Sequence, residues 1–161
     1  MFKLTSEFYL KIIFLFSFIA LISAFFIEYI LGHQPCNLCL IERIPYVFSI
    51  MIIMGIFLIK KNQKFLVVLL ILTFIFSFAI SFYHFGIEQG FFQESSVCGV
   101  KSLTEIITKE DLLKQLSEKT ISCKDVTFRI FGLSLTSINI VISLLFIITL
   151  LEIFKEYEKN R

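Results

Sequence analysis

Four cysteines are the residues of this chain whose type and spacing could carry out chemistry. Cys36 and Cys39 form a Cys-x-x-Cys pair, whereas 24 residues separate Cys98 from Cys123. Two cysteines with two residues between them can close a disulfide across one turn. A thiol at a helix N-terminus or beside a cation has its pKa lowered from about 8.5 toward roughly 3.5–7.5. The sequence therefore predicts a reactive dithiol at residues 36–39. Together with the second pair, this dithiol could form a route for electrons.

Arg43 is a candidate for lowering the pKa of a cysteine in this pair. It follows Cys39 by four residues, which is one helical turn if a single helix includes both. A guanidinium stays protonated and offers a permanent positive charge to a thiolate. The other interpretation of Arg43 is an interfacial anchor. Glu42, its neighbour, is predicted to be solvated or paired rather than catalytic.

Zinc binding and structural bracing are the alternatives for the cysteines. Only one pair has the two-residue spacing of a zinc site, so we predict no metal. A Cys98–Cys123 bridge would restrain its loop by roughly 3 kcal/mol in the chain-entropy model, and a purely structural bridge stays open. The two histidines, His33 and His84, are more typical of polar interface residues than of ligands. His84 is the better functional candidate.

The elements that must position these residues are membrane helices. Hydrophobic residues make up 57% of the 161 residues, and 21 are phenylalanine. A helix needs roughly 20 residues to cross a hydrocarbon core about 30 Å thick. Four apolar runs approach or reach that length, near residues 12–31, 44–59, 65–84 and 133–151. We predict an all-α membrane protein, a four-helix bundle that forms a single membrane domain over residues 1–161.

The first apolar run is predicted to stay in the protein as a helix. Its uncharged stretch, Ile12 to Ile27, is longer than the 7–15-residue core of a signal peptide. With four spans, the segments 32–43 and 85–132 emerge on one face, and the turn 60–64 lies on the other. Two crossings separate the two cysteine segments, so both cysteine pairs lie on the same side of the membrane.

The distribution of charge orients the bundle. Basic residues close to helix ends favour the cytoplasmic face. Eight lie on the face that carries the termini, against seven on the other, where seven acidic residues of the long loop offset them. We therefore predict cytoplasmic termini and cysteine loops on the outer face. An oxidising compartment also suits disulfides. The eight residues are Lys3, Lys11, Lys60, Lys61, Lys64, Lys155, Lys159 and Arg161.

Proline and helical periodicity predict the local structure of the two outer loops. Pro45 is tolerated in the first turn of a helix, so the second helix is expected to start near Glu42 or Arg43. A kink in a helix that starts nearer Cys36 is the alternative. Ser102-Leu103-Thr104-Glu105 fits a capping box and opens an amphipathic helix over about 103–118. That helix would pack over the bundle mouth or lie in the outer lipid interface.

The last span contains one amide side chain. Asn139 is expected to face a neighbouring helix or a cavity rather than lipid. The chain shows no basic patch interleaved with aromatic residues and no glycine-rich phosphate loop. We therefore predict that nucleic acid is not a partner. The apolar runs predict that a lipid bilayer surrounds the chain.

The segment Cys36-Asn37-Leu38-Cys39-Leu40-Ile41-Glu42-Arg43 resembles the Cys-x-x-Cys-x-x-Glu-Arg signature of the bacterial disulfide bond formation protein B (DsbB) family. The stretch from Tyr83 to Gly90, the pair Cys98-Gly99 and the stretch from Cys123 to Leu135 also resemble that family, in the right order. The resemblance therefore extends from the first span to the last. It departs from the family after Glu-Arg, where Ile44-Pro45 could alter the start of the helix.

The resemblance implies an inner-membrane enzyme, a thiol:quinone oxidoreductase that re-oxidises a periplasmic thioredoxin-like oxidase (DsbA-like). The catalytic cysteines would be Cys98 and Cys123, which face the partner, and Cys36 and Cys39, which face the quinone. Ubiquinone is the expected acceptor and menaquinone the alternative. By the same resemblance, four residues are the candidates for binding the quinone: Arg43, His84, Glu88 and Gln89.

A non-catalytic protein is the competing interpretation of this sequence. A four-helix membrane scaffold could use the same cysteines only as structural disulfides, as an adaptor or assembly factor would. The two interpretations differ in cysteine behaviour. The enzyme requires cysteines that cycle with the supply of quinone, whereas the scaffold requires fixed disulfides.

Overall fold

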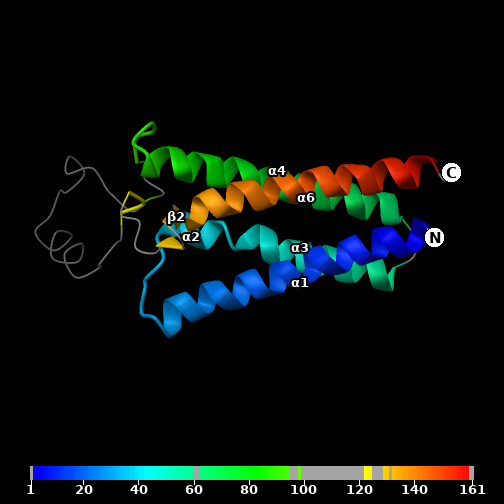
Figure 1. The fold of residues 1–161 in the computed structure, drawn as a ribbon, viewed down its shortest axis with the longest axis horizontal. Coiled ribbons are helices and arrows are strands. Elements are labelled where there is room, and N and C mark those ends of the chain that lie inside the picture. The colour runs from blue at the N-terminus through cyan, green and yellow to red at the C-terminus, as the bar shows by residue number, and fades with distance from the viewer. Residues whose placement is uncertain are drawn as a thin grey trace, which may run out of the picture.

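Four long helical segments run alongside one another in the computed structural model (Figure 1). The structure describes residues 2–59, 62–94, 98, 122–124, 129–130 and 132–159. The helices are α1 (Phe2–Tyr29), the short α2 (Asn37–Ile41), α3 (Ile44–Leu58), α4 (Gln63–Glu88) and α6 (Leu135–Lys159). Strands β1 (Arg129–Ile130) and β2 (Leu133–Ser134) form an antiparallel hairpin before α6. The amphipathic helix predicted near 103–118 lies outside the described residues.

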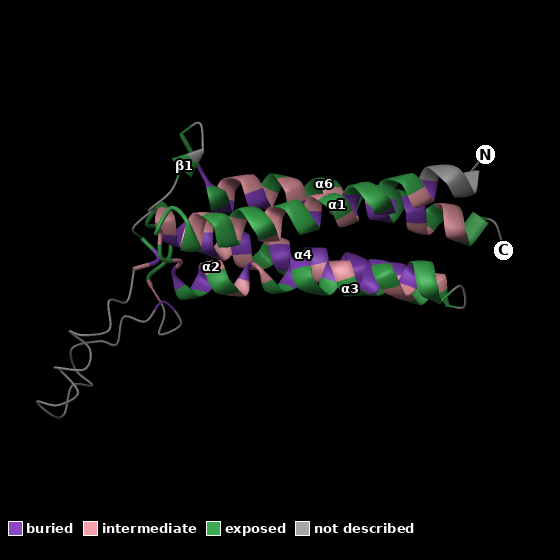
Figure 2. Cartoon of the chain, turned by 90° about the horizontal axis from the view of Figure 1, so that it is seen from below, coloured by how far each residue is buried: buried purple, intermediate pink, exposed green. Residues whose placement is uncertain are grey.

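Within the part of the chain that the structure describes, four stretches are long and apolar enough to cross a membrane: Ser6–Tyr29, Asn37–Leu58, Gln63–Glu88 and Leu135–Lys159. This result confirms the predicted all-α, four-helix membrane bundle. Figure 2 shows buried positions on the faces where helices meet and many exposed positions on the outward faces. Most exposed positions carry large apolar side chains, such as Phe18, Phe76 and Leu145. Such side chains suit contact with lipid.

Two helices continue beyond their predicted spans. The apolar run of α4 was expected to close near His84, but α4 ends at Glu88, one turn later. Gly90, which has a left-handed φ of +79°, follows and allows the chain to turn. Helix α6 extends past the predicted residue 151 to Lys159. Charged residues end an apolar span, but they do not end a helix, because Glu and Lys are good helix formers.

The dithiol segment combines features of both structures expected for it. A short helix, α2, begins directly after Cys36, and a turn at Glu42 and Arg43 separates it from α3. Pro45 lies in the first turn of α3, where its missing N–H has no acceptor to lose. The turn places Glu42 and Arg43 between α2, which packs against α4, and α3, which packs against both α4 and α1.

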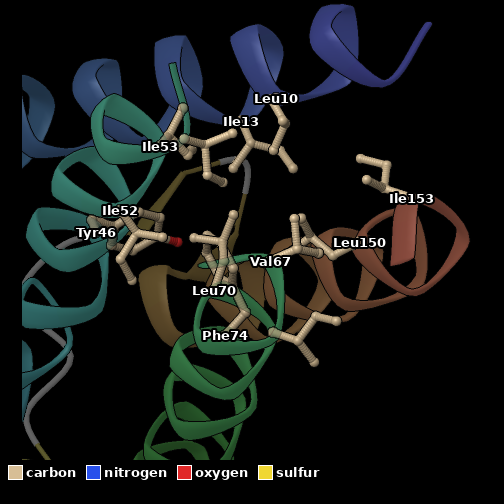
Figure 3. Packing of buried hydrophobic residues seen from close by; sticks show 12 residues of the cluster. Leu10, Ile13, Tyr46, Ile52, Ile53, Val67, Leu70, Phe74, Leu150 and Ile153 are labelled. Atoms are coloured by element: carbon tan, nitrogen blue, oxygen red, sulfur yellow. The ribbon is translucent and has the colours of Figure 1, made fainter. Parts of the chain in front are cut away.

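The apolar core lies toward the end of the bundle that carries the termini. Figure 3 shows Leu10, Ile53, Leu70 and Leu150, from four helices, pointing toward one another. Serine pairs tie helices together alongside this core: Ser49 donates to Ser17 at 3.0 Å. Small side chains allow close helix approach in a membrane. The chain termini lie at one end of the bundle, and the cysteine segments lie at the other (Figure 1).

Candidate active site

Cys36 and Cys39 form a close pair at the start of α2. Cys36 is the N-cap residue, and the backbone N–H of Cys39 donates to its Sγ at 3.3 Å. The two Sγ atoms lie 2.7 Å apart as free thiols. The pKa of Cys36 falls from its ordinary 9.0 to about 4, because hydrogen bonds from Cys39 and His84 outweigh the effect of burial. Cys36 is therefore the acidic thiol of the predicted reactive pair.

His84 of α4 lies on the other side of Cys36. Its Nε2 is 3.6 Å from the Cys36 Sγ, and its Nδ1 is 2.9 Å from Oε1 of Glu42. The residue is 2% exposed. A carboxylate on Nδ1 fixes the orientation of the ring and supports a positive charge on it. Thiol, imidazole and carboxylate thus form an acid–base row, in which His84 lies between Cys36 and Glu42.

Glu42 is buried and paired, so of the two states predicted for it, solvated or paired, the structure shows the second. Its second oxygen, Oε2, accepts from Nδ2 of Asn139 at 3.3 Å. Asn139 also donates to Ser81 at 2.7 Å and accepts from the Tyr46 hydroxyl at 2.5 Å. The prediction that Asn139 faces neighbouring helices is confirmed. Its link to the dithiol was not foreseen, because no spacing in the sequence connects residue 139 with residue 42.

Arg43 contacts α1 rather than a cysteine. Its Nη1 lies 2.5 Å from Oε2 of Glu28, and its guanidinium lies over the Phe25 ring, 5.3 Å from the centroid. Sequence reasoning missed this partnership. The signal was available: Glu28 is the one acidic residue near the outer end of an otherwise apolar run, and such residues pair with an opposite charge.

A cavity of about 260 Å³ opens beside the dithiol. Its walls are mostly apolar side chains of α1 and α6, and its polar lining includes Cys39, Arg43 and His84. Glu88 lines it as well, and its buried Oε2 has no hydrogen-bond partner among the described residues. Gln89, the fourth predicted quinone contact, caps the end of α4, is exposed and is not part of the lining. The apolar walls are formed by Phe16, Ala20, Leu21, Ala24, Ile27, Leu135, Ile138 and Ile142.

The second cysteine pair is a disulfide at the same end of the bundle. Cys98 and Cys123 are joined, with their Cα atoms 5.7 Å apart. Both are buried in one cluster with Cys36, Leu38 and Ile87. Cys123 also lines the cavity that contains the dithiol. The cysteine pairs thus lie together, as the parity of the spans predicted.

Ligand atoms of Cys36, Cys39 and His84 lie within 4.8 Å of one another. Two sulfurs and one imidazole nitrogen would provide three of the four ligands of a typical zinc site. The same atoms are also those of a dithiol with an adjacent base. The prediction of no bound metal stays a prediction.

An acidic thiol, a buried imidazole and a neighbouring disulfide, held in a helical membrane bundle, define a membrane thiol–disulfide oxidoreductase. Comparisons with known proteins agree with this class. The family described as "Disulfide bond formation protein DsbB" matches residues 6–153. An uncharacterized protein of Rickettsia prowazekii (strain Madrid E), RP370, is 32% identical over 136 residues, which cover 83% of this chain and 79% of the relative.

The chain belongs to the DsbB family. It is therefore a multi-pass membrane oxidoreductase of protein disulfide formation, in a family that uses quinones.

Proposed function

We propose that this protein is an inner-membrane thiol:quinone oxidoreductase that re-oxidises a periplasmic DsbA-like oxidase. Electrons enter at Cys98 and Cys123, pass to Cys36 and Cys39, and leave to a membrane quinone. The termini lie in the cytoplasm and the cysteine loops in the periplasm. One observation carries the proposal: the cavity is lined by both Cys39 and Cys123 and is walled by apolar side chains of two spans.

The cavity suits a quinone in shape and in chemistry. A quinone ring with an isoprenoid tail needs apolar walls, which α1 and α6 supply. Ring oxygens need hydrogen-bond donors, and Arg43 and His84 lie in the lining. The quinone supplies an acceptor for two electrons. Arg43 would hold negative charge at this position, and ubiquinone is the proposed acceptor, with menaquinone as the alternative.

Four thiol–disulfide exchanges would bring two electrons to the dithiol. A thiolate of the partner attacks Cys98, forms a mixed disulfide and releases Cys123 as thiolate. Cys123 then attacks Cys36 of an oxidised Cys36–Cys39 pair and releases Cys39 as thiolate. The partner's second thiolate then attacks the mixed disulfide, so that the partner leaves with its own disulfide and Cys98 is released as thiolate. Cys98 attacks Cys123 of the Cys123–Cys36 disulfide and releases Cys36 as thiolate, so both electrons remain on Cys36 and Cys39. A free dithiol beside an intact Cys98–Cys123 bridge matches this reduced state.

The energetics require an unusually oxidising second pair or a strong final acceptor. A DsbA-type oxidase has a potential near −120 mV, and every 30 mV is worth about 1.4 kcal/mol for two electrons. Structural disulfides lie below about −300 mV and could not take its electrons. A stabilised thiolate at Cys36 makes the reduced Cys36–Cys39 pair more stable, which raises its potential.

Purified full-length protein, a reduced DsbA-like oxidase and ubiquinone provide the test, with quinone absorbance as the readout. Wild type should reduce quinone with either the oxidase or a small dithiol as electron source. Cys98→Ser should respond only to the small dithiol, which reaches Cys36 and Cys39 directly. Cys39→Ser should respond to neither. Quinone reduction by Cys39→Ser would refute the proposed route.

The scaffold remains the alternative and makes a different prediction for the same samples. Its disulfides would stay fixed when quinone is withheld, as read by trapping free thiols with an alkylating reagent. The enzyme should instead accumulate reduced Cys36 and Cys39 under that condition.

A further inference from the structure

The geometry points to Asn139 as the positioning residue of the dithiol: it holds Glu42, and Glu42 in turn holds His84 against Cys36. Asn139 does not touch either sulfur and acts only through this row of side chains. The inference rests on the proposed function in one respect, that Cys36 is a redox thiol.

Three helices meet at the amide of Asn139, which α6 contributes. From α3, the Tyr46 hydroxyl donates to its Oδ1 at 2.5 Å. From α4, Ser81 accepts from its Nδ2 at 2.7 Å. Glu42, in the turn between α2 and α3, accepts from the same nitrogen at 3.3 Å. The hydroxyl of Ser143 lies 3.5 Å from Oδ1. The donors on Oδ1 fix which way the amide faces, so its two N–H groups point to Ser81 and Glu42.

Glu42 needs this support because it is buried. A carboxylate removed from water is unstable as an anion unless it is hydrogen-bonded. Asn139 occupies one oxygen of Glu42 and His84 the other, so both are used. The anion then supports a positive imidazole, whose Nε2 lies 3.6 Å from the Cys36 Sγ. Loss of the amide would weaken each step of this row, and the effect would appear at Cys36.

Other ionisable groups face the row, and none replaces Asn139. Cys39 lies against Cys36. Oε1 of Glu88 lies 3.9 Å from Nε2 of His84. Arg43 is in an ion pair with Glu28, which offsets its charge. Among the described residues, three further ionisable groups line the same cavity: the Tyr46 hydroxyl, which is bonded to Asn139, Cys123, which is bonded to Cys98, and His33.

The test measures the alkylation of Cys36 in the reduced, detergent-solubilised full chain from pH 3 to pH 9, with each cysteine followed separately by mass spectrometry. Neither quinone nor partner is present, so a failed quinone assay and a failed result here are distinguishable. Asn139→Leu should move the half-point of Cys36 alkylation upward by about one pH unit. Alkylation below the half-point would then be about tenfold slower.

Ser81→Ala is the matched control, because Ser81 contacts the same amide nitrogen but does not touch Glu42. It should leave the half-point unchanged.

Tyr46→Phe provides a second variant if Asn139→Leu fails to fold. Loss of the hydroxyl frees the amide to rotate, and the half-point of Cys36 alkylation should rise by a smaller amount. An unchanged half-point in a folded Asn139→Leu protein, or in Tyr46→Phe when the first variant is unfolded, would overturn the inference. An equal rise in Ser81→Ala would overturn it too.

Discussion

The two ends of this bundle are built on different rules. Near the termini, Leu70, Ile53 and Leu150 fill the space between helices with apolar side chains, and the Ser49–Ser17 pair lies alongside them. Near the dithiol, Glu42, His84 and Asn139 are also buried, but each is held by polar partners. Packing of apolar side chains determines the structure of the first end. Pairing of hydrogen-bond donors with acceptors determines that of the second.

The difference teaches where chemistry can be placed in a membrane bundle. Polar groups inside a membrane are expensive unless they are paired, so a cluster of them indicates a functional site. Here the cluster lies at one end, next to a cavity and a disulfide. The other end supplies stability. Substitutions at the two ends should therefore affect different properties.

Leu70→Ala should give the largest effect on stability and none on the dithiol. Leu70 is fully buried, so its truncation leaves a cavity. We expect a loss of about 2 kcal/mol in the free energy of unfolding, the lower end for such changes, since lipid solvates the unfolded side chain nearly as well. Denaturing-detergent titration would measure it. Leu72→Ala, at a position 56% exposed on the same helix, is the control and should change little. If Leu70→Ala shifted the pH profile of Cys36, the two ends would be coupled.

Arg43→Lys should lower turnover without changing stability. The guanidinium reaches Glu28 and lies on the Phe25 ring at once, whereas an ammonium is a point charge and cannot match both contacts. We expect about a tenfold fall in quinone reduction, which corresponds to about 1.4 kcal/mol. Steady-state kinetics with reduced oxidase would measure it. Unchanged kinetics would show that Arg43 only anchors the helix and that the residues needed for the reaction lie closer to the sulfurs.

The smallest effect concerns pH. The lowered pKa of Cys36, about 4, means that its thiolate stabilises the reduced fold fully above the ordinary pKa of 9.0. That stabilisation declines as pH falls and is gone below about 4. Reduction of the pair at pH 5–8 should therefore take up one proton for two electrons. The potential should change by about 30 mV per pH unit, not about 59 mV.

Redox titration at several pH values would measure this slope. His84→Gln, which removes the imidazole beside Cys36, should raise the pKa of Cys36 and steepen the slope toward about 59 mV in the lower part of the range. A slope near 59 mV in the wild type would show that Cys36 is an ordinary thiol and that the polar end lacks the proposed acid–base row.

Local patterns were enough to predict most of the fold. The apolar runs predicted four spans because crossing a membrane depends on the length and composition of one segment at a time. Pro45 placed the start of α3 within one or two residues. The ends of α4 and α6 were missed, since a helix can continue beyond the end of its apolar run.

The candidate site was predicted in part. The cysteines, Arg43 and His84 were singled out, whereas Glu28 and Asn139 were not assigned to it.

The sequence by itself determined that this chain crosses a membrane and carries two cysteine pairs on one side of it. Those properties depend on composition, on the order of residues and on the number of crossings. Only the tertiary structure decided which thiol is acidic and why. Cys36 depends on His84, Glu42 and Asn139, which are 48, 6 and 103 residues away along the chain. Their contacts exist only because helix packing brings α2, α4 and α6 together, and hydrogen bonds operate over about 3 Å, whatever the separation in sequence.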